Sequence, residues 1–150
     1  MNNISKVYVD IVSELDQIFA ELGMGDTEYR RGAAWLKALV LFAVDCPKSW
    51  QKGHLELLGK MNNITRERVR VILWRTAAEK WNYKCWEDLC ERFGYSVEVH
   101  FEIASKPNTY EFVALLADNL RMKYQIRPKD TQTEEEFEMK LTGIIDSIGR

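Results

Sequence analysis

The sequence lacks the features that mark membrane, secreted and disordered proteins. No apolar run approaches the length of a membrane-spanning helix, and the first residues contain no hydrophobic secretory segment. Only three of the 150 residues are prolines and 46% are hydrophobic, a composition that argues against extensive disorder. A chain of this length is long enough to bury a core of its own. We therefore expect a single folded domain, located in the cytoplasm.

Side chains that carry catalysis or bind metal are also scarce. The three cysteines, Cys46, Cys85 and Cys90, match no zinc-binding spacing with the two histidines, so we expect reduced thiols and no metal site. Neither His54 nor His100 belongs to a recognisable catalytic arrangement, and the sequence contains no glycine-rich phosphate loop. The sequence thus predicts a protein that is not an enzyme and that uses no cofactor.

The charged residues are segregated along the chain, although the net charge is only −2. Residues 1–28 carry one basic and six acidic side chains, and residues 130–150 carry two basic and six acidic ones. Residues 29–129 carry 18 basic and 11 acidic side chains, a net charge of +7. A basic centre between acidic ends is typical of a polyanion-binding module. Ordinary solvated helix surface would give the same pattern, so charge alone leaves both interpretations open.

Apolar residues recur at helical spacing along most of the chain, which predicts an all-α fold. In the first such stretch, from Ile4 to Leu22, they alternate steps of four and three residues, and Gly23 can take the left-handed conformation that ends a helix. The last stretch begins with three glutamates, which suit the N-terminal end of a helix dipole. Helices are expected at about residues 4–22, 27–44, 54–60, 65–81, 86–92, 109–123 and 133–147.

Residues 54–81 have the outline of a helix-turn-helix. A short helix, His54–Lys60, is followed by the polar turn Asn62–Ile64. Thr65 is a suitable N-cap for a longer helix that reaches Trp81, because its hydroxyl can accept a hydrogen bond from a backbone amide of the first turn. This second helix is basic, since it carries four arginines.

The basic helix 65–81 is expected to turn one face to the core and the other to a ligand. At 100° per residue, the core face consists of Val69, Ile72, Leu73 and Thr76. The opposite face, flanked by the arginines, consists of Glu67, Val71, Trp74 and Ala78. Solubilising charge is the alternative interpretation of these arginines. The residues predicted to contact DNA are Lys60, Arg66, Glu67, Arg68, Arg70, Val71, Trp74 and Arg75.

Two segments carry a resemblance to a known family. Residues 106–121 read Lys-Pro-Asn-Thr-Tyr-Glu-Phe-Val-Ala-Leu-Leu-Ala-Asp-Asn-Leu-Arg, and residues 93–97 read Phe-Gly-Tyr-Ser-Val. Both resemble the DNA-binding effector domain of the sporulation response-regulator family of stage-zero sporulation protein A, the first of them nearly residue for residue. Together with the opening helix and the basic helix, the similarity spans about residues 15–123.

The resemblance implies a single-domain, six-helix bundle that binds double-stranded DNA, with the basic helix in the major groove. It also implies contact with an RNA polymerase sigma factor in the control of sporulation genes. A receiver domain is not expected here, because only about 14 residues precede the similarity. The chain is expected to divide into an N-terminal helical extension 1–14, the effector-like domain 15–123, a linker 124–132 and a C-terminal acidic amphipathic helix 133–150.

The basic helix departs from the family at positions that contact DNA. Two arginines that the family uses for DNA contact align with Val71 and Trp74, and a family glutamate aligns with Arg70. Arginine can bind the O6 and N7 atoms of guanine through a bidentate pair, which valine and tryptophan cannot. The leading hypothesis is a DNA-binding transcription regulator that recognises a different sequence. The alternative is a protein-interaction or dimerisation module that keeps the effector fold without binding DNA.

The apolar stripe of the first helix predicts a homodimer. Large apolar side chains along one seam would each forgo roughly 1.5–3 kcal/mol of burial if they stayed in water. An effector domain without a receiver also needs another means of pairing. The alternative is packing of the first and last helices within one protomer. The dimer interface is predicted at Ile4, Tyr8, Ile11, Leu15 and Ile18.

Overall fold

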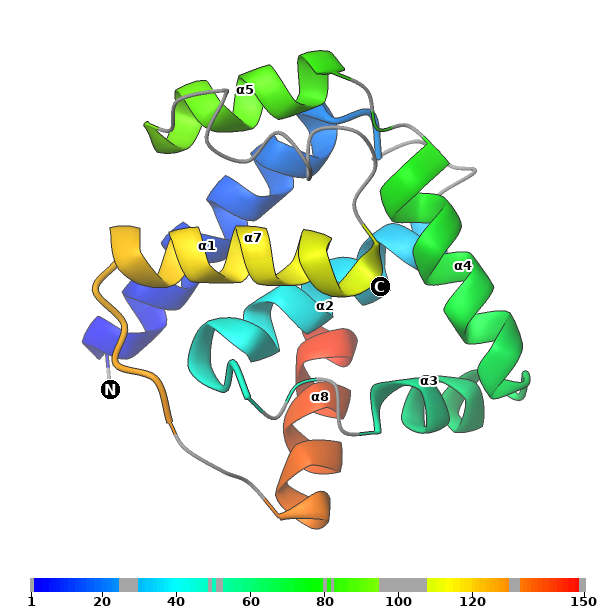
Figure 1. The fold of residues 1–150 in the computed structure, drawn as a ribbon. Helices are drawn as coiled ribbons and strands as arrows, with labels where there is room; N and C mark the ends of the chain where they lie inside the picture. The colour runs from blue at the N-terminus through cyan, green and yellow to red at the C-terminus, as the bar shows by residue number, and fades with distance from the viewer. Residues whose placement is uncertain are drawn as a thin grey trace.

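The computed structural model describes residues 2–24, 30–48, 50, 53–79, 81, 83–94, 108–129 and 133–148, without the side chains of residues 2–6, 83, 86 and 148. The described helices are α1 (Asn2–Glu21), α2 (Arg30–Asp45), α3 (His54–Asn62), α4 (Arg66–Glu79), α5 (Tyr83–Phe93), α7 (Thr109–Lys123) and α8 (Glu134–Ile148). The described residues form no strand (Figure 1), which confirms the predicted all-α fold.

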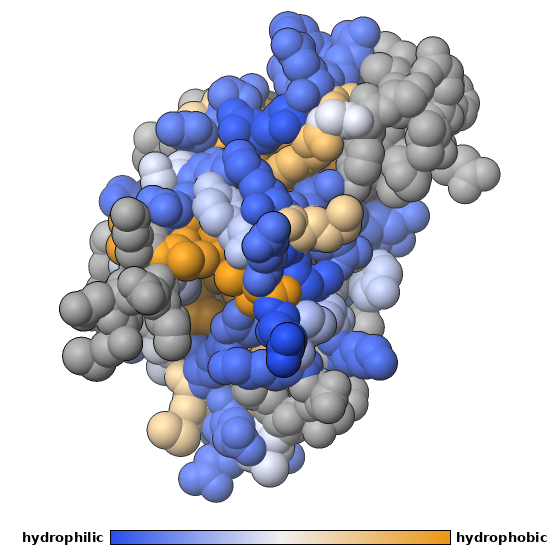
Figure 2. All heavy atoms as spheres, turned by 90° about the vertical axis from the view of Figure 1, so that its left-hand side faces the viewer, coloured by the Kyte–Doolittle hydropathy of each residue, from blue (hydrophilic) through white to orange (hydrophobic). Residues whose placement is uncertain are grey.

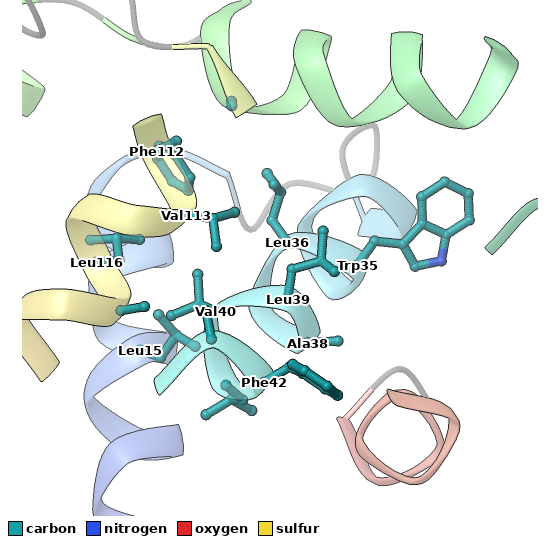
Figure 3. Packing of buried hydrophobic residues seen from close by; sticks show 14 of the residues in the cluster. Leu15, Trp35, Leu36, Ala38, Leu39, Val40, Phe42, Phe112, Val113 and Leu116 are labelled. Atoms are coloured by element: carbon teal, nitrogen blue, oxygen red, sulfur yellow. The ribbon is translucent and has the colours of Figure 1, made fainter. Parts of the chain in front are cut away.

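Helix α2 is the centre of the fold. Eleven of its 16 residues are buried, and other helices surround it (Figure 1). On one side, Leu15 of α1 and Leu116 of α7 lie beside Val40 (Figure 3). On another side, the ring centroids of Phe42 and of Phe137 in α8 lie 4.9 Å apart. All of these side chains belong to one continuous core, so α8 is an integral part of it.

The apolar stripe of α1 packs inside the protomer. Ile11, Leu15 and Ile18 are buried in the core that α1 shares with α2 and α7. These three side chains have almost no surface left for a second copy, so the predicted dimer seam is corrected to intramolecular packing. Tyr8 is partly exposed, and the side chain of Ile4 lies outside the described residues. Homodimerisation itself stays a prediction.

Local backbone signals set the ends of α1 and α7. Gly23 has a φ of 77°, and the Met24 amide donates to the Phe19 carbonyl at 2.9 Å, which ends α1. At the start of α7, Asn108 Oδ1 accepts from the Glu111 amide at 2.8 Å. Glu111 Oε1 in return accepts from the Asn108 amide at 3.0 Å, which completes a capping box. The predicted first helix and the predicted helix over 109–123 are therefore confirmed.

A buried carboxylate joins α1, α5 and the end of α7. Glu14 accepts hydrogen bonds from Lys123 Nζ at 2.7 and 2.9 Å, and from the Tyr124 hydroxyl at 2.7 Å. Arg92 Nη1 lies 3.5 Å from the same carboxylate. Burial by itself raises the pKa of Glu14, but these hydrogen bonds and positive charges outweigh it, so the pKa lies below its ordinary value. Burial, followed by the hydrogen bond to Glu14, raises the pKa of Tyr124 to about 12.

The crossing of α2 and α4 depends on Gly32. A Cβ atom at this position would lie 1.9 Å from Thr76 Oγ1 and 2.9 Å from Thr76 Cβ. Thr76 is buried and its hydroxyl donates to the Ile72 carbonyl at 2.8 Å, so its side chain has little room to turn away. We expect Gly32→Ala to destabilise the protein by about 1–3 kcal/mol through overpacking, measured as the free energy of unfolding in urea.

The matched control for this substitution is Gly143→Ala. Gly143 lies inside α8, and a Cβ atom there would meet no heavy atom within 4 Å. Alanine is the better helix former at an open position, so this variant is expected to gain roughly 0.5–1 kcal/mol. A Gly32→Ala protein as stable as the wild type would contradict the close crossing of α2 and α4.

Candidate nucleic-acid interface

A three-residue turn joins α3 to α4, in agreement with the outline predicted for residues 54–81. Its first residue, Asn63, has φ 56° and ψ 45°, a left-handed conformation that asparagine tolerates better than most residues. The Ile64 amide donates to the Gly59 carbonyl at 3.0 Å. A Cβ atom at position 59 would lie 2.8 Å from the Ile64 carbonyl oxygen, so this tight turn requires glycine there. The turn therefore fixes how α4 leaves α3.

Thr65 caps the N-terminus of α4, as predicted. Its Oγ1 accepts a hydrogen bond from the Arg68 amide at 3.1 Å. The remaining amides of the first turn lie at the positive end of the helix dipole, on an exposed part of the surface. This end of α4 is therefore suited to an anion such as a phosphate group.

The core face of α4 holds the predicted residues, of which Ile72 is half-buried, and it also includes Ala77 and Ala78. Val69, Leu73 and Thr76 are buried, and α4 packs against both α2 and α3. Ala78, which was predicted on the outer face, is buried as well. Just beyond α4, the Trp81 amide donates to the Ala78 carbonyl at 3.2 Å. The outer face is therefore shorter than predicted and ends before Ala78.

The outer face of α4 has an apolar centre. Val71 is 37% exposed and Trp74 is 48% exposed. Side chains three residues apart lie on the same side of a helix, so these two form one apolar strip. At 100° per residue, arginines border the strip on both sides: Arg66 and Arg70 on one, Arg68 and Arg75 on the other.

Two of these arginines are paired with glutamates outside the apolar strip. Arg66 Nη1 lies 2.9 Å from Glu56 Oε2 of α3, across the turn. Arg75 Nε lies 3.2 Å from Glu79 Oε2, four residues further along α4. All four side chains are largely exposed to solvent. Such pairs are weak and are screened by salt, so a phosphate oxygen can replace the carboxylate oxygen.

The third pair, Arg70 with Glu67, lies on α4 itself. The hydrogen bond from Arg70 lowers the pKa of the Glu67 carboxyl and raises the pKa of the Arg70 guanidinium. Arg68, by contrast, forms no ion pair with any residue that the structure describes, and Lys60 is exposed on α3. Arg68 and Lys60 are thus the cations at this surface that an anion can approach without first displacing a described carboxylate.

All eight residues predicted to contact DNA are exposed. They belong to α3 and α4, which are neighbours in the fold (Figure 1). Glu56 and Glu79 were not among the predicted residues, and the pairing of Glu67 with Arg70 was not predicted. Glu67 and Glu79 stand three and four residues from their partners, a helical spacing that is recognisable in the sequence. Glu56 reaches its partner only through the geometry of the turn, which the spacing does not give.

Other charged and thiol groups among the described residues form no comparable site. The pocket between α1 and α5 is lined by Glu21, Asp88, Glu91 and Arg92, a mainly acidic set that does not suit a polyanion. The described residues contain no group of three or more histidines, cysteines or acidic residues that could hold a metal ion. Burial raises the pKa of the Cys46 thiol. None of the helices in the described ranges combines the length and apolarity needed to cross a membrane.

The chain matches no protein-family model and no solved structure. The resemblance to sporulation effector domains therefore stays a prediction that depends on the residues quoted for it. Of those residues, 95–97 and 106–107 lie outside the described ranges. The candidate interface is thus defined by the geometry of α3, the turn and α4.

Proposed function

We propose that this protein is a transcription regulator that binds duplex DNA through the outer face of α4. The observation that carries the proposal is the exposed outer face of α4, on which arginines border an apolar centre on both sides. The tight turn with the left-handed residue Asn63 orients this helix, and α2 packs against its core face. A face of this kind fits the major groove, where side chains at the helix centre meet base edges and those at the borders meet phosphates.

The proposed contacts divide the face into two parts. The arginines at its borders and Lys60 on α3 hold the two phosphate backbones, and the capped N-terminus of α4 adds its positive dipole. Three arginines exchange a carboxylate partner for a phosphate on binding, so part of the electrostatic gain is offset by the pair that is lost. Binding should therefore depend on salt, but less steeply than four unpaired arginines would give.

A protein-interaction module is the second candidate. It is favoured by Val71 and Trp74, because an exposed tryptophan beside a valine is typical of the centre of a protein interface. The internal ion pairs of the arginines favour it too, since they reduce the positive charge offered to DNA. The family resemblance implies an RNA polymerase sigma factor as the partner, and the apolar stripe of the first helix led to the prediction of a second copy of the chain. Binding to such a partner would depend only weakly on salt.

The Arg68→Ala substitution is expected to weaken binding to a random-sequence duplex and to flatten its salt dependence. Each phosphate contact that is lost reduces the slope of log K against log salt by roughly 0.9. Fluorescence anisotropy of a labelled duplex, titrated at low and at moderate salt, measures both quantities for the wild type and the variant.

The matched control is Arg127→Ala, which removes an exposed arginine from the segment between α7 and α8. Residues 124–129 lie on the side of the molecule away from α4 (Figure 1), and the described residues seen on that side are largely hydrophilic (Figure 2). The control is expected to keep both the affinity and the slope of the wild type. If both variants lose the same amount of affinity and of salt dependence, DNA binding cannot be assigned to the outer face of α4. If the wild type binds no duplex even at low salt, DNA binding is excluded and the protein-interaction module is the function that stands.

A further inference from the structure

The chemistry at the centre of the α4 face differs from that at its borders. Val71 and Trp74 occupy the centre together with Glu67, whose carboxylate is bound by Arg70, whereas Arg66 and Arg75 bind carboxylates at the border. An arginine that recognises guanine must direct both arms of its guanidinium group at the O6 and N7 atoms of the base. Arginines at the border of the helix, already oriented by carboxylates, are better placed for the phosphates that run along the groove. Base recognition therefore falls to the apolar strip.

The base pairs offer one apolar group at the floor of the major groove, the C5-methyl group of thymine. Val71 exposes more than a third of its surface, so its methyl groups are accessible from the groove side. Trp74 stands one turn further along the same face, at a Cβ separation of about 5–6 Å for this spacing. A thymine methyl group that approaches α4 can thus contact the valine and the edge of the indole together.

We infer that Val71 and Trp74 select duplex sites in which thymine methyl groups face α4. The inference rests on the proposed function and names its ligand class: T·A-containing DNA recognised by an apolar contact. Burial of a methyl-sized group is worth a roughly fourfold change in affinity. The specificity of this surface is accordingly set by a few methyl groups, while the arginines supply affinity that is independent of sequence.

Replacement of thymine by deoxyuridine tests this inference directly, because it removes the methyl group and keeps the atoms that pair the bases. The probe is a set of duplexes selected by the wild type from a random pool, each then remade with deoxyuridine in place of thymine. The wild type is expected to bind the deoxyuridine form roughly fourfold more weakly for each methyl group that it contacts. The Val71→Ala variant is expected to lose most of this difference.

The matched control is Val9→Ala, the same substitution at an exposed valine on α1, 62% exposed and far from α4 in the chain. It is expected to discriminate between thymine and deoxyuridine as the wild type does. Equal affinity of the wild type for both forms would overturn the inference and leave the proposed DNA binding intact. Discrimination that persists in Val71→Ala would overturn it as well. If the wild type selects no duplex from the pool, the inference and the proposed function both fail.

Discussion

Ile11→Asp is expected to unfold the protein, whereas Val9→Asp, two residues earlier on the same helix, is expected to leave its stability almost unchanged. Ile11 is 4% exposed and packs in the core shared by α1, α2 and α7, while Val9 is 62% exposed. An unpaired carboxylate in such a core costs several kcal/mol, against a total stability of about 5–15 kcal/mol for a domain of this kind. The measurement is urea unfolding followed by circular dichroism.

The same pair of variants separates a core position from a dimer seam. At a seam between two copies, aspartate at position 11 would give a folded monomer, and the stability of the wild type would rise with protein concentration. Sedimentation equilibrium and unfolding at two protein concentrations distinguish these cases. A folded, monomeric Ile11→Asp protein would contradict the intramolecular packing of α1 and restore the predicted seam.

Glu14→Gln is expected to cost about 1.5–3 kcal/mol, because hydrogen bonds to a charged group are among the strongest in a folded protein. The Glu14 side chain is only 7% exposed and bonds to both Lys123 and Tyr124. The matched control is Asp16→Asn on the same helix. Asp16 pairs with Lys37 at 2.9 Å but is 55% exposed, so its loss should cost less than about 1 kcal/mol.

The cost of Glu14→Gln should also depend on pH. The pKa of Glu14 is lowered in the folded protein, so its contribution is fully present above the ordinary carboxyl pKa of 4.5 and is lost as the pH falls through the lower, folded value. The difference in unfolding free energy between wild type and Glu14→Gln should therefore shrink in acid. A difference that stays constant down to the acid transition would contradict the ionised state of Glu14 at this junction.

The alkaline side gives a second signal from the same junction. The pKa of Tyr124 is raised to about 12, so its contribution is fully present below 10 and is lost as the pH rises toward 12. Removal of the Glu14 charge should lower this pKa toward 10. Ultraviolet titration of tyrosinate in the wild type and in Glu14→Gln measures the change.

The sequence predicted those elements whose causes are local. The helix at 109–123 was predicted from apolar residues at helical spacing, and the Asn108–Glu111 capping box fixes its first turn. The turn after α3 and the N-cap Thr65 were predicted for the same reason: each depends on backbone groups within a few residues. Periodicity likewise identified most of the core face of α4.

Features that depend on tertiary packing were not predictable from spacing. The stripe of α1 shows that one face must be covered, but a period of 3.6 residues does not say whether the same chain or a second copy covers it. Ala78 is buried in the folded protein, although its angle on α4 alone placed it on the outer face. The need for glycine at positions 32 and 59 appears only when a neighbouring helix or turn lies against it.

The position of the DNA contact can be mapped directly from the backbone amide chemical shifts of the isotope-labelled protein, titrated with a random-sequence duplex at low salt. The account predicts that the largest changes fall on the α3–α4 turn and on α4 from Arg66 to Arg75, and that they shrink as salt is added. Amides of α5 and of the segment after α7 should change little. An absence of any change, or changes centred on α5 or α8, would contradict the claim that the outer face of α4 binds DNA.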